Sequence, residues 1–272
     1  MNILLALDCT PGSEDMVGEV LEQPWPRGAR FTVLHVRDQA GREEYEERCL
    51  HAAVFAISER GWQATRHLLE GSPKQQILDY AEQHSPDLIL VGDRRRSNVS
   101  RFVLGSVSTS VMRHAKCSVQ IVRPRVRDFR AERAMRVMLA TDGSTQASKA
   151  AEAVARRPWR PGTEARVVSV VELILPPTVS LIEPCEPGFP PHPDDFAEAK
   201  RLARCSASRA AQIIGSACSH VSESIPVVAS GAKNAIIEEA KGWDADCIFL
   251  GSHGVHGLDR FLLGSVSEAV AV

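Results

Sequence analysis

The chain has no apolar run of membrane-spanning length, since a transmembrane helix needs about 20 consecutive apolar residues. Its first apolar run, Ile3–Leu7, is also far too short for the core of a secretory signal peptide. The formal net charge is only −2, whereas a general nucleic-acid binder is normally strongly basic. These absences predict a cytoplasmic protein that neither enters membranes nor binds nucleic acid.

Cysteine pairs with CxxC spacing are absent, and the seven cysteines are odd in number. This pattern is typical of small buried hydrophobic side chains in a reducing compartment. Cys9 and Cys185 lie in loop-like surroundings and are the candidates for exposed thiols, although burial is the simpler interpretation. HExxH pairs are absent as well, and His253 and His256 alone offer too few ligands for a metal site.

A glycine-rich pattern near the end of the chain is the most informative feature. Gly251-Ser252-His253-Gly254 is followed, after nine further residues, by Gly264-Ser265. The apolar segment 246–250 before it reads as a buried strand, and 264–272 reads as the beginning of a helix. Glycines let a ligand approach the backbone, and the helix dipole favours negative charge, so this arrangement predicts a phosphate ligand.

The pattern belongs to an internal repeat. One register aligns 74–108 with 233–267, and a second register, with a smaller offset, aligns Asp8 with Asp142 and Val36 with Val170. Because the offset grows along the chain, the second copy carries an insertion, for which the proline-rich segment 171–193 is the candidate. A lid over a ligand and a disordered loop are the two interpretations of this segment. We expect domains at 1–125 and 135–272, each large enough for its own core.

Each copy is predicted to alternate strands with helices. Continuous apolar runs such as 88–91 are typical of a parallel sheet covered on both faces. In the first copy we expect strands at 2–8, 31–36, 63–70, 87–91 and 118–122, and helices at 13–21, 43–60, 74–84 and 105–114, with Ser13 capping the first helix. Ligands of such sheets bind at the carboxyl ends of strands. Asp8 and Asp142, each ending a first strand, would therefore lie beside the glycine-rich loops.

With these residues in place, the chain resembles a tandem universal stress protein, with two UspA-like domains in one polypeptide. The resemblance rests on the G-x-x-G-x9-G-S pattern of Gly251, Gly254, Gly264 and Ser265, and on the turn Asp142-Gly143-Ser144. It implies an α/β fold of two tandem open parallel-sheet domains, Rossmann-like and of the adenine nucleotide alpha hydrolase-like type. It also implies ATP binding, which often accompanies an intact loop in this family.

The resemblance assigns the phosphates to the loop, the ribose or adenine to Asp142, and the adenine to the backbone at Val170. The residues themselves agree, because a serine hydroxyl can donate to a phosphate while an ionised carboxylate suits a ribose hydroxyl or an adenine amine. Alternatively, the glycines only shape turns and Asp142 caps a helix. The residues predicted to contact ATP, with Mg2+ screening its phosphates, are Ala140, Thr141, Asp142, Val170, Gly251, His253, Gly254, Gly264, Ser265, Val266 and Ser267.

The first copy departs from the loop pattern. Arg95 stands where the second copy has Gly254, and Asp93 adds a negative charge. The run 94–96 of three arginines could grip a phosphate, although a solvated basic turn is the simpler interpretation. We expect a poor or differently tuned nucleotide site in this domain, whose main role would be intramolecular pairing with the second domain.

The match between the copies ends before a counterpart of the strand at 118–122, so the second sheet is expected to lack its last strand. An exposed sheet edge favours domain pairing and association into a homo-oligomer. A Walker lysine in GxxxxGK[ST] form is absent, and His253 is the one candidate base beside the loop. We therefore expect a nucleotide binder, with a slow ATPase and a nucleotide-free interaction scaffold as the alternatives.

Overall fold

The computed structural model describes residues 1–10, 12–37, 43–93, 104–123, 134–172, 193–228, 231–254 and 263–271. The chain forms two compact units, one of residues 1–132 with 271–272 and one of residues 133–270. Within the described ranges, no helix combines the length and the apolar character that crossing a membrane requires.

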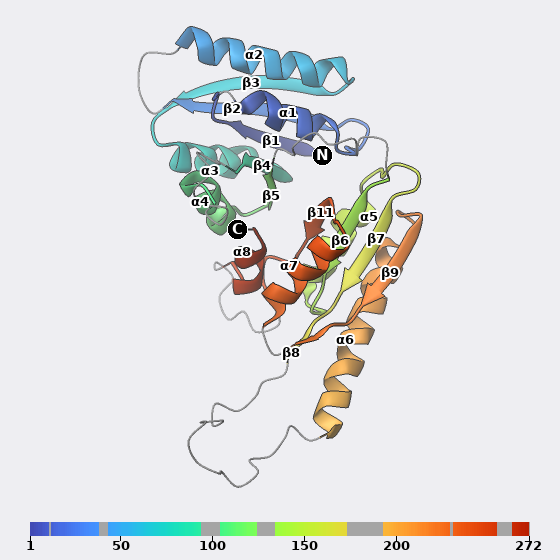
Figure 1. The fold of residues 1–272 in the computed structure, drawn as a ribbon. Helices are drawn as coiled ribbons and strands as arrows, with labels where there is room; N and C mark the ends of the chain where they lie inside the picture. Colours follow the sequence, from blue (N-terminus) through green and yellow to red (C-terminus); the bar gives the residue numbers. More distant parts are fainter. Residues whose placement is uncertain are drawn as a thin grey trace, which may run out of the picture. The chain divides into compact units, whose positions relative to one another are not determined.

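The first unit contains a five-stranded parallel sheet in the order β3-β2-β1-β4-β5 (Figure 1). The chain moves outward from β1 to β3 and then returns to the other side of β1, which creates a switch point between β1 and β4. Every element lies within one residue of its expected bounds: β1 (Asn2–Leu7), α1 (Ser13–Leu21), β2 (Arg30–Arg37), α2 (Glu43–Glu59), β3 (Gln63–Glu70), α3 (Pro73–His84), β4 (Leu88–Gly92), α4 (Ser106–His114) and β5 (Ser118–Val122).

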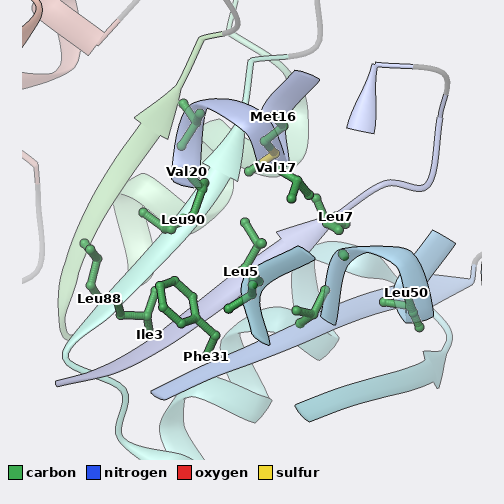
Figure 2. Close-up of a cluster of buried hydrophobic side chains, with 14 of the residues drawn as sticks. Ile3, Leu5, Leu7, Met16, Val17, Val20, Phe31, Leu50, Leu88 and Leu90 are labelled. Atoms are coloured by element: carbon green, nitrogen blue, oxygen red, sulfur yellow. The ribbon is translucent and has the colours of Figure 1, made fainter. Parts of the chain in front are cut away.

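Helices cover both faces of this sheet, and the alternation of side chains along β1 shows how. Ile3, Leu5 and Leu7 point to one face, where they pack with Val20 of α1 and with α2 (Figure 2). Leu4 points to the other face and packs against α3 and α4. Full burial of one such side chain contributes roughly 1.5–3 kcal/mol. The continuous apolar runs in the sequence therefore reflect a sheet with two covered faces.

The second unit repeats this plan with a smaller sheet, of order β11-β6-β7-β9, again parallel. In the described part of the chain, no strand pairs with β11 on the side where β5 pairs with β4, as the sequence predicted. Its elements are β6 (Arg136–Ala140), α5 (Thr145–Ala155), β7 (Glu164–Val168), β8 (Val171–Glu172), α6 (Pro193–Ile214), β9 (His220–Ser224), β10 (Val227–Val228), α7 (Ala232–Gly242), β11 (Cys247–Phe249) and α8 (Ser265–Ala271).

A proline separates a small second sheet from the main one. β8 and β10 pair with each other in parallel, beyond the ends of β7 and β9. Pro226, between β9 and β10, has no N–H to donate to the ladder, although its carbonyl accepts from the amide of Val171 at 2.9 Å. In the first unit the corresponding pair, β2 and β3, runs unbroken over eight residues. Val170 therefore lies between two short strands, whereas its counterpart Val36 lies inside one.

Several residues repeated between the copies make the same contacts. The carboxylates of Asp87 and Asp246 accept hydrogen bonds from the amides of Asn2 (2.6 Å) and Arg136 (2.7 Å), each the first residue of its central strand. The indole nitrogens of Trp25 and Trp159 donate to main-chain carbonyls five residues earlier, at 2.7 and 2.8 Å. Much of the repeat therefore preserves the framework of the fold.

The first turn of each unit differs in its cap. Ser13 was expected to cap α1, and this was wrong: Gly12 is the N-cap, and the Ser13 hydroxyl donates instead to Asp8 Oδ1 at 3.0 Å. In the second unit Ser144 is a true cap, because its hydroxyl accepts from the amide of Ala147 at 3.2 Å. Asp142, the alternative cap, accepts from the amide of Ser144 itself.

The end of β11 packs against the beginning of α5 without room for a side chain. A Cβ on Gly251 would lie 2.7 Å from the amide nitrogen of Ala147 and 2.8 Å from the carbonyl carbon of Gln146. These atoms are backbone and cannot turn aside. The equivalent Cβ on Gly92 in the first unit would meet the sulfur of Met16 at 3.1 Å, and that side chain is flexible.

This difference predicts unequal costs for the same substitution. Gly251→Ala should lower the free energy of unfolding of the second unit by about 1–3 kcal/mol, as overpacking typically does. Gly92→Ala is the matched control and should cost less, because the Met16 side chain can move. Urea denaturation without nucleotide measures both. Equal effects of the two substitutions would contradict this explanation of Gly251.

Candidate functional site

The residues predicted to form a nucleotide site come together at the carboxyl edge of the second sheet. They belong to three segments: the end of β6 with the following turn, the loop after β11, and the beginning of α8. Residues 255–262 of the loop, including His256 and Arg260, lie outside the described residues, as does most of the proline-rich segment 171–193. The described part of the candidate site consists of residues 140–142, 170, 251–254 and 264–267.

Two hydrogen bonds close the loop on itself. The amide of Gly264 donates to the carbonyl of Ser252 at 2.7 Å, and the hydroxyl of Ser267 donates to the carbonyl of Gly251 at 2.6 Å. The first unit contains the same second bond, from Ser108 to Gly92, also at 2.6 Å. Because this bond occurs in both copies, we assign the Ser267 hydroxyl a structural role and not a role in ligand binding.

Asp142 and Gly254 meet on the open side of the loop. Both residues are exposed, and a Cβ added to Gly254 would lie 2.7 Å from Asp142 Oδ2. The other carboxylate oxygen, Oδ1, accepts from the amide of Ser144 at 3.0 Å, which fixes the orientation of the group. The φ angle of Gly254 is not positive, so a glycine is favoured here by the closeness of the carboxylate and not by backbone strain. A side chain at position 254 would therefore crowd the Asp142 carboxylate.

Ser265 begins α8 and is exposed. The first hydrogen bond within the helix runs from the amide of Glu268 to the carbonyl of Gly264 at 2.9 Å. Helix geometry leaves the amides that precede this one, those of Ser265, Val266 and Ser267, without partners inside the helix. The side chain of Val266 is partly buried in the core, so Val266 offers a ligand its backbone alone.

The remaining predicted residues lie deeper. Ala140 is buried in the core at the end of β6. Thr141 is buried too: its amide donates to the carbonyl of Val168 at 2.9 Å, and its hydroxyl accepts from the amide of Gly143 at 3.2 Å. Val170 packs its side chain partly into the same core. These three residues shape the floor of the site, and only their backbone is placed to approach a ligand.

His253 is held between the loop and α5. Its Nδ1 shares a hydrogen bond of 2.9 Å with the hydroxyl of Ser252, and its carbonyl accepts from the hydroxyl of Ser144 at 3.4 Å. Its Nε2 is buried and has no hydrogen-bond partner. A ring whose free nitrogen is shielded from solvent is poorly placed to take a proton from a substrate or a water.

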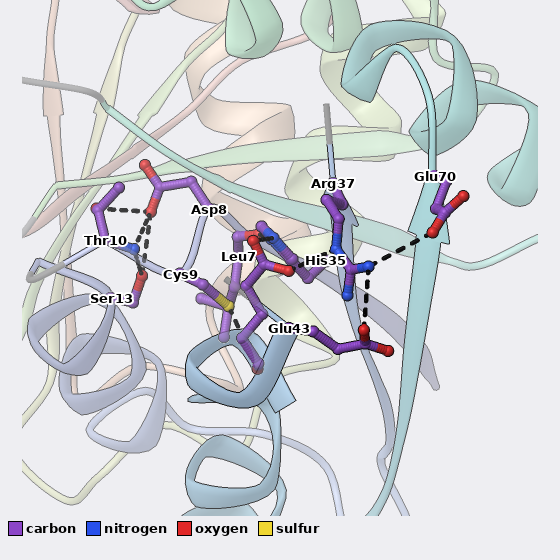
Figure 3. Close-up of polar contacts among 10 residues, drawn as sticks. Leu7, Asp8, Cys9, Thr10, Ser13, His35, Arg37, Glu43 and Glu70 are labelled. Atoms are coloured by element: carbon purple, nitrogen blue, oxygen red, sulfur yellow. Dashed lines mark hydrogen bonds and ion pairs between the residues drawn. The ribbon is translucent and has the colours of Figure 1, made fainter. Parts of the chain in front are cut away.

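The corresponding turn of the first unit is closed by its own side chains. Asp8 Oδ1 accepts from the amide and hydroxyl of Thr10, at 3.2 and 2.8 Å, and from the hydroxyl of Ser13 at 3.0 Å (Figure 3). In the second unit, Asp142 Oδ1 accepts from the backbone amide of Ser144. Asp93, expected to add negative charge to the loop, is paired with Arg123, whose Nε donates to it at 2.9 Å. The run 94–96, including Arg95, lies outside the described residues.

A buried charge cluster at the end of β2 was not foreseen from the sequence. Arg37 donates to Glu46 of α2 at 2.8 Å, and the two side chains are only 10% and 11% exposed. His35 lies 3.6 Å from Glu46, and its Nδ1 donates to the carbonyl of Leu7 at 2.8 Å (Figure 3). The available signal was the pair of basic residues, His35 and Arg37, at the end of a strand whose other polar residues are Arg30 and Thr32. These side chains fill the edge of the sheet that in the second unit adjoins Val170.

Metal binding by side chains alone has no support in the described ranges, where no group of three or more His, Cys, Asp or Glu side chains could hold an ion.

Known proteins resemble this chain in sequence and in fold. A universal stress protein of Staphylococcus haemolyticus is 31% identical over 141 residues, covering 45% of this chain and 84% of that protein. The crystal structure of a universal stress protein from Archaeoglobus fulgidus has a TM-score of 0.65 at 22% identity, covering 99% of this chain and 94% of the other. One from Pseudomonas aeruginosa has a TM-score of 0.63 at 14% identity, covering 99% and 88%. At such identities the structures show the fold alone.

A family model, which describes many related sequences together, also matches this chain. The family model for the universal stress protein family matches residues 37–123 and again residues 134–272. The two matched segments, one in each unit, cover most of the chain and mean that it belongs to the universal stress protein family as a tandem member.

Proposed function

We propose that this universal stress protein acts in a stress response by binding an adenine nucleotide, ATP, mainly in its second unit. The observation that carries the proposal is the exposed carboxylate of Asp142 against the bare backbone of Gly254, at the carboxyl edge of a parallel sheet. This edge is where ligands of such sheets bind. Two hydrogen bonds hold the neighbouring backbone of 251–252 against 264–267.

The two ends of the site suit different parts of the nucleotide. An ionised carboxylate is an acceptor alone, so Asp142 would receive ribose hydroxyls or the adenine amine and would repel phosphate. The phosphates belong at the other end, where the Ser265 hydroxyl and the amides of 265–267 are donors. Mg2+ would reduce the repulsion between Asp142 and the phosphates by screening the triphosphate. The floor formed by Ala140, Thr141 and Val170 would take the base.

The first unit is proposed to bind ATP weakly or not at all. Its Asp8 carboxylate is already occupied by Thr10 and Ser13. In addition, the His35, Arg37 and Glu46 side chains occupy the edge of the sheet where an adenine would lie. Denaturing the purified protein and identifying the released nucleotides provides a direct first test, with about one nucleotide per chain expected.

Substitution of Gly254 tests the loop. Gly254→Arg copies Arg95 of the first unit and should abolish ATP binding in calorimetry, because even its Cβ would lie 2.7 Å from Asp142 Oδ2. Gly242→Arg is the control: no atom lies within 4 Å of a Cβ there, at the end of α7, and binding should be retained. Wild-type affinity in Gly254→Arg would refute the assignment.

Substitution of the two aspartates identifies the unit that binds. Asp142→Asn can keep the hydrogen bond from Ser144 but loses the charge, and should weaken ATP binding by about 10- to 100-fold, as losing a hydrogen bond to a charged group does. Asp8→Asn is the matched change in the first unit and should leave the affinity unchanged. The reverse ranking, measured by calorimetry, would place the site in the first unit. Cyclic AMP, which has the adenine and ribose but no triphosphate, should share the Asp142 dependence.

Catalysis is not part of the proposal. Fast phosphoryl transfer needs a positioned nucleophile and preorganised positive charge at the γ-phosphate. The described site offers backbone amides and the hydroxyls of two exposed serines, Ser252 and Ser265, while the free nitrogen of His253 is buried.

We therefore expect ATP to be retained with slow or undetectable turnover in a phosphate-release assay. His253→Ala should not change whatever hydrolysis is seen, because Nε2 is shielded. Turnover on the order of 1 per second, the range of ordinary enzymes, combined with its loss in His253→Ala, would establish the enzyme alternative instead.

A further inference from the structure

Two cysteines of the first unit lie together beneath the Asp8 turn. Cys9 follows Asp8 between β1 and α1, and Cys49 lies on α2, beyond the whole of α1 and β2 in the sequence. Cys49 packs against the buried cluster that contains Cys9, and a hydrogen-bonding interaction between the two thiols is the largest cause of the pKa shift of each. Cys9 Sγ also lies 3.9 Å from the carbonyl oxygen of Glu46, one helical turn before Cys49 (Figure 3). The side chain of Cys9 is thus directed at the turn of α2 that carries Cys49.

The backbone holds Cys9 in this position against its own preference. Its φ angle is +47°, a left-handed conformation that side chains other than glycine rarely adopt. The second unit has Gly143 at the equivalent place, with φ +79°. Cys9 is 5% exposed and belongs to the hydrophobic core, with Cys49 packed against that core. The first unit has therefore kept the turn but placed a buried thiol where the second has a glycine.

The hydrogen bond makes the two thiols unequal. Because Cys9 donates to it, the pKa of Cys49 is lowered, and a weaker contribution from Ser13 acts in the same direction. Burial and the nearby carboxylates of Asp8 and Glu14 oppose this effect. The same hydrogen bond, together with burial, raises the pKa of Cys9. Cys49 is half-buried, whereas Cys9 is buried. The sulfur of Cys49 is thus the more accessible and the more reactive of the two.

We propose that Cys9 and Cys49 are a redox-active pair that a hydroperoxide converts to a reversible intramolecular disulfide. The Cys49 thiolate sulfur attacks the outer oxygen of the hydroperoxide, the O–O bond breaks, and the alkoxide or hydroxide that leaves takes up a proton. The product is a sulfenic acid on Cys49. The Cys9 sulfur then attacks that sulfur, the S–O bond breaks, and water leaves with the proton of Cys9. Two thiols and one hydroperoxide give one disulfide, one alcohol or water, and one water.

The bond would tie the Asp8 turn to α2. It closes a loop of about 40 residues, so it restricts the unfolded chain and stabilises the first unit. A thiol reductant reverses it by exchange. This site is independent of the proposed nucleotide site, because all its residues belong to the first unit.

Peptide mapping of the full chain tests the proposal. The reduced protein is treated with hydrogen peroxide, alkylated, digested with trypsin and analysed by mass spectrometry. Cys9 and Cys49 fall in different tryptic peptides, 1–27 and 49–60, and each is the single cysteine of its peptide. The expected product is these two peptides joined by a disulfide, which dithiothreitol separates. Recovery of both as alkylated free thiols, at a peroxide dose that oxidises the exposed Cys205, would overturn the proposal.

Variants assign the two roles. Cys9→Gly copies Gly143 and suits the positive φ, so it should fold, and its Cys49 should stop at the sulfenic acid and react with dimedone. Cys49→Ser should leave Cys9 reduced; Cys49→Ala replaces it if the serine variant is unfolded by circular dichroism. Cys205→Ser is the control and should form the disulfide as the wild type does. A disulfide between Cys9 or Cys49 and any other cysteine in the wild type, or no dimedone adduct in Cys9→Gly, would refute the pairing.

Discussion

The candidate site depends on the close contact between the end of β11 and the first turn of α5. This contact leaves no space for a side chain on Gly251. Gly251 passes from the strand directly over the backbone of Gln146 and Ala147, and its carbonyl receives the hydroxyl of Ser267. The strand, α5 and α8 are thereby joined at one residue. The loop that leaves Gly251 is closed again by the bond between Ser252 and Gly264. These two bonds hold the described ends of the loop, 251–254 and 264–267, against each other.

The two units share this framework and differ in what they build on it. The serine-to-glycine bond at the end of the fourth strand is present in both, and so are the aspartate and tryptophan contacts that position the strands. At the carboxyl edge the second unit keeps an exposed carboxylate beside a glycine, whereas the first fills the same edge with His35, Arg37 and Glu46. The framework contacts are thus the same in the two units, while the side chains at the edge differ.

The Asp8 turn shows such a change in detail. A cysteine in a left-handed conformation is strained by roughly 1–2 kcal/mol relative to glycine. The hydrogen bonds that Asp8 receives from Thr10 and Ser13 hold the turn in shape, and the burial of Cys9 offsets part of the strain. A peroxide-sensitive thiol pair would be consistent with membership of a stress-protein family, since oxidants are one form of stress. Together, the two proposals would make one unit a sensor of the nucleotide pool and the other a sensor of the redox state.

The sequence by itself determined the α/β class, the tandem repeat, the bounds of the elements in the first unit and the smaller second sheet. Apolar runs, caps and glycines act locally, so these features could be read from neighbouring residues. It also placed Asp142, Gly254 and Ser265 at one edge, because parallel strands of known order end together. The tertiary structure alone decided which of the predicted residues are open to a ligand. Ser267 and Gly264 are used by the framework, Ser13 bonds to Asp8 instead of capping, Pro226 divides a strand pair, and Cys9 meets Cys49 from a different element of the fold. Each of these depends on partners outside the local pattern, whose positions are set by the packing of helices on the sheet.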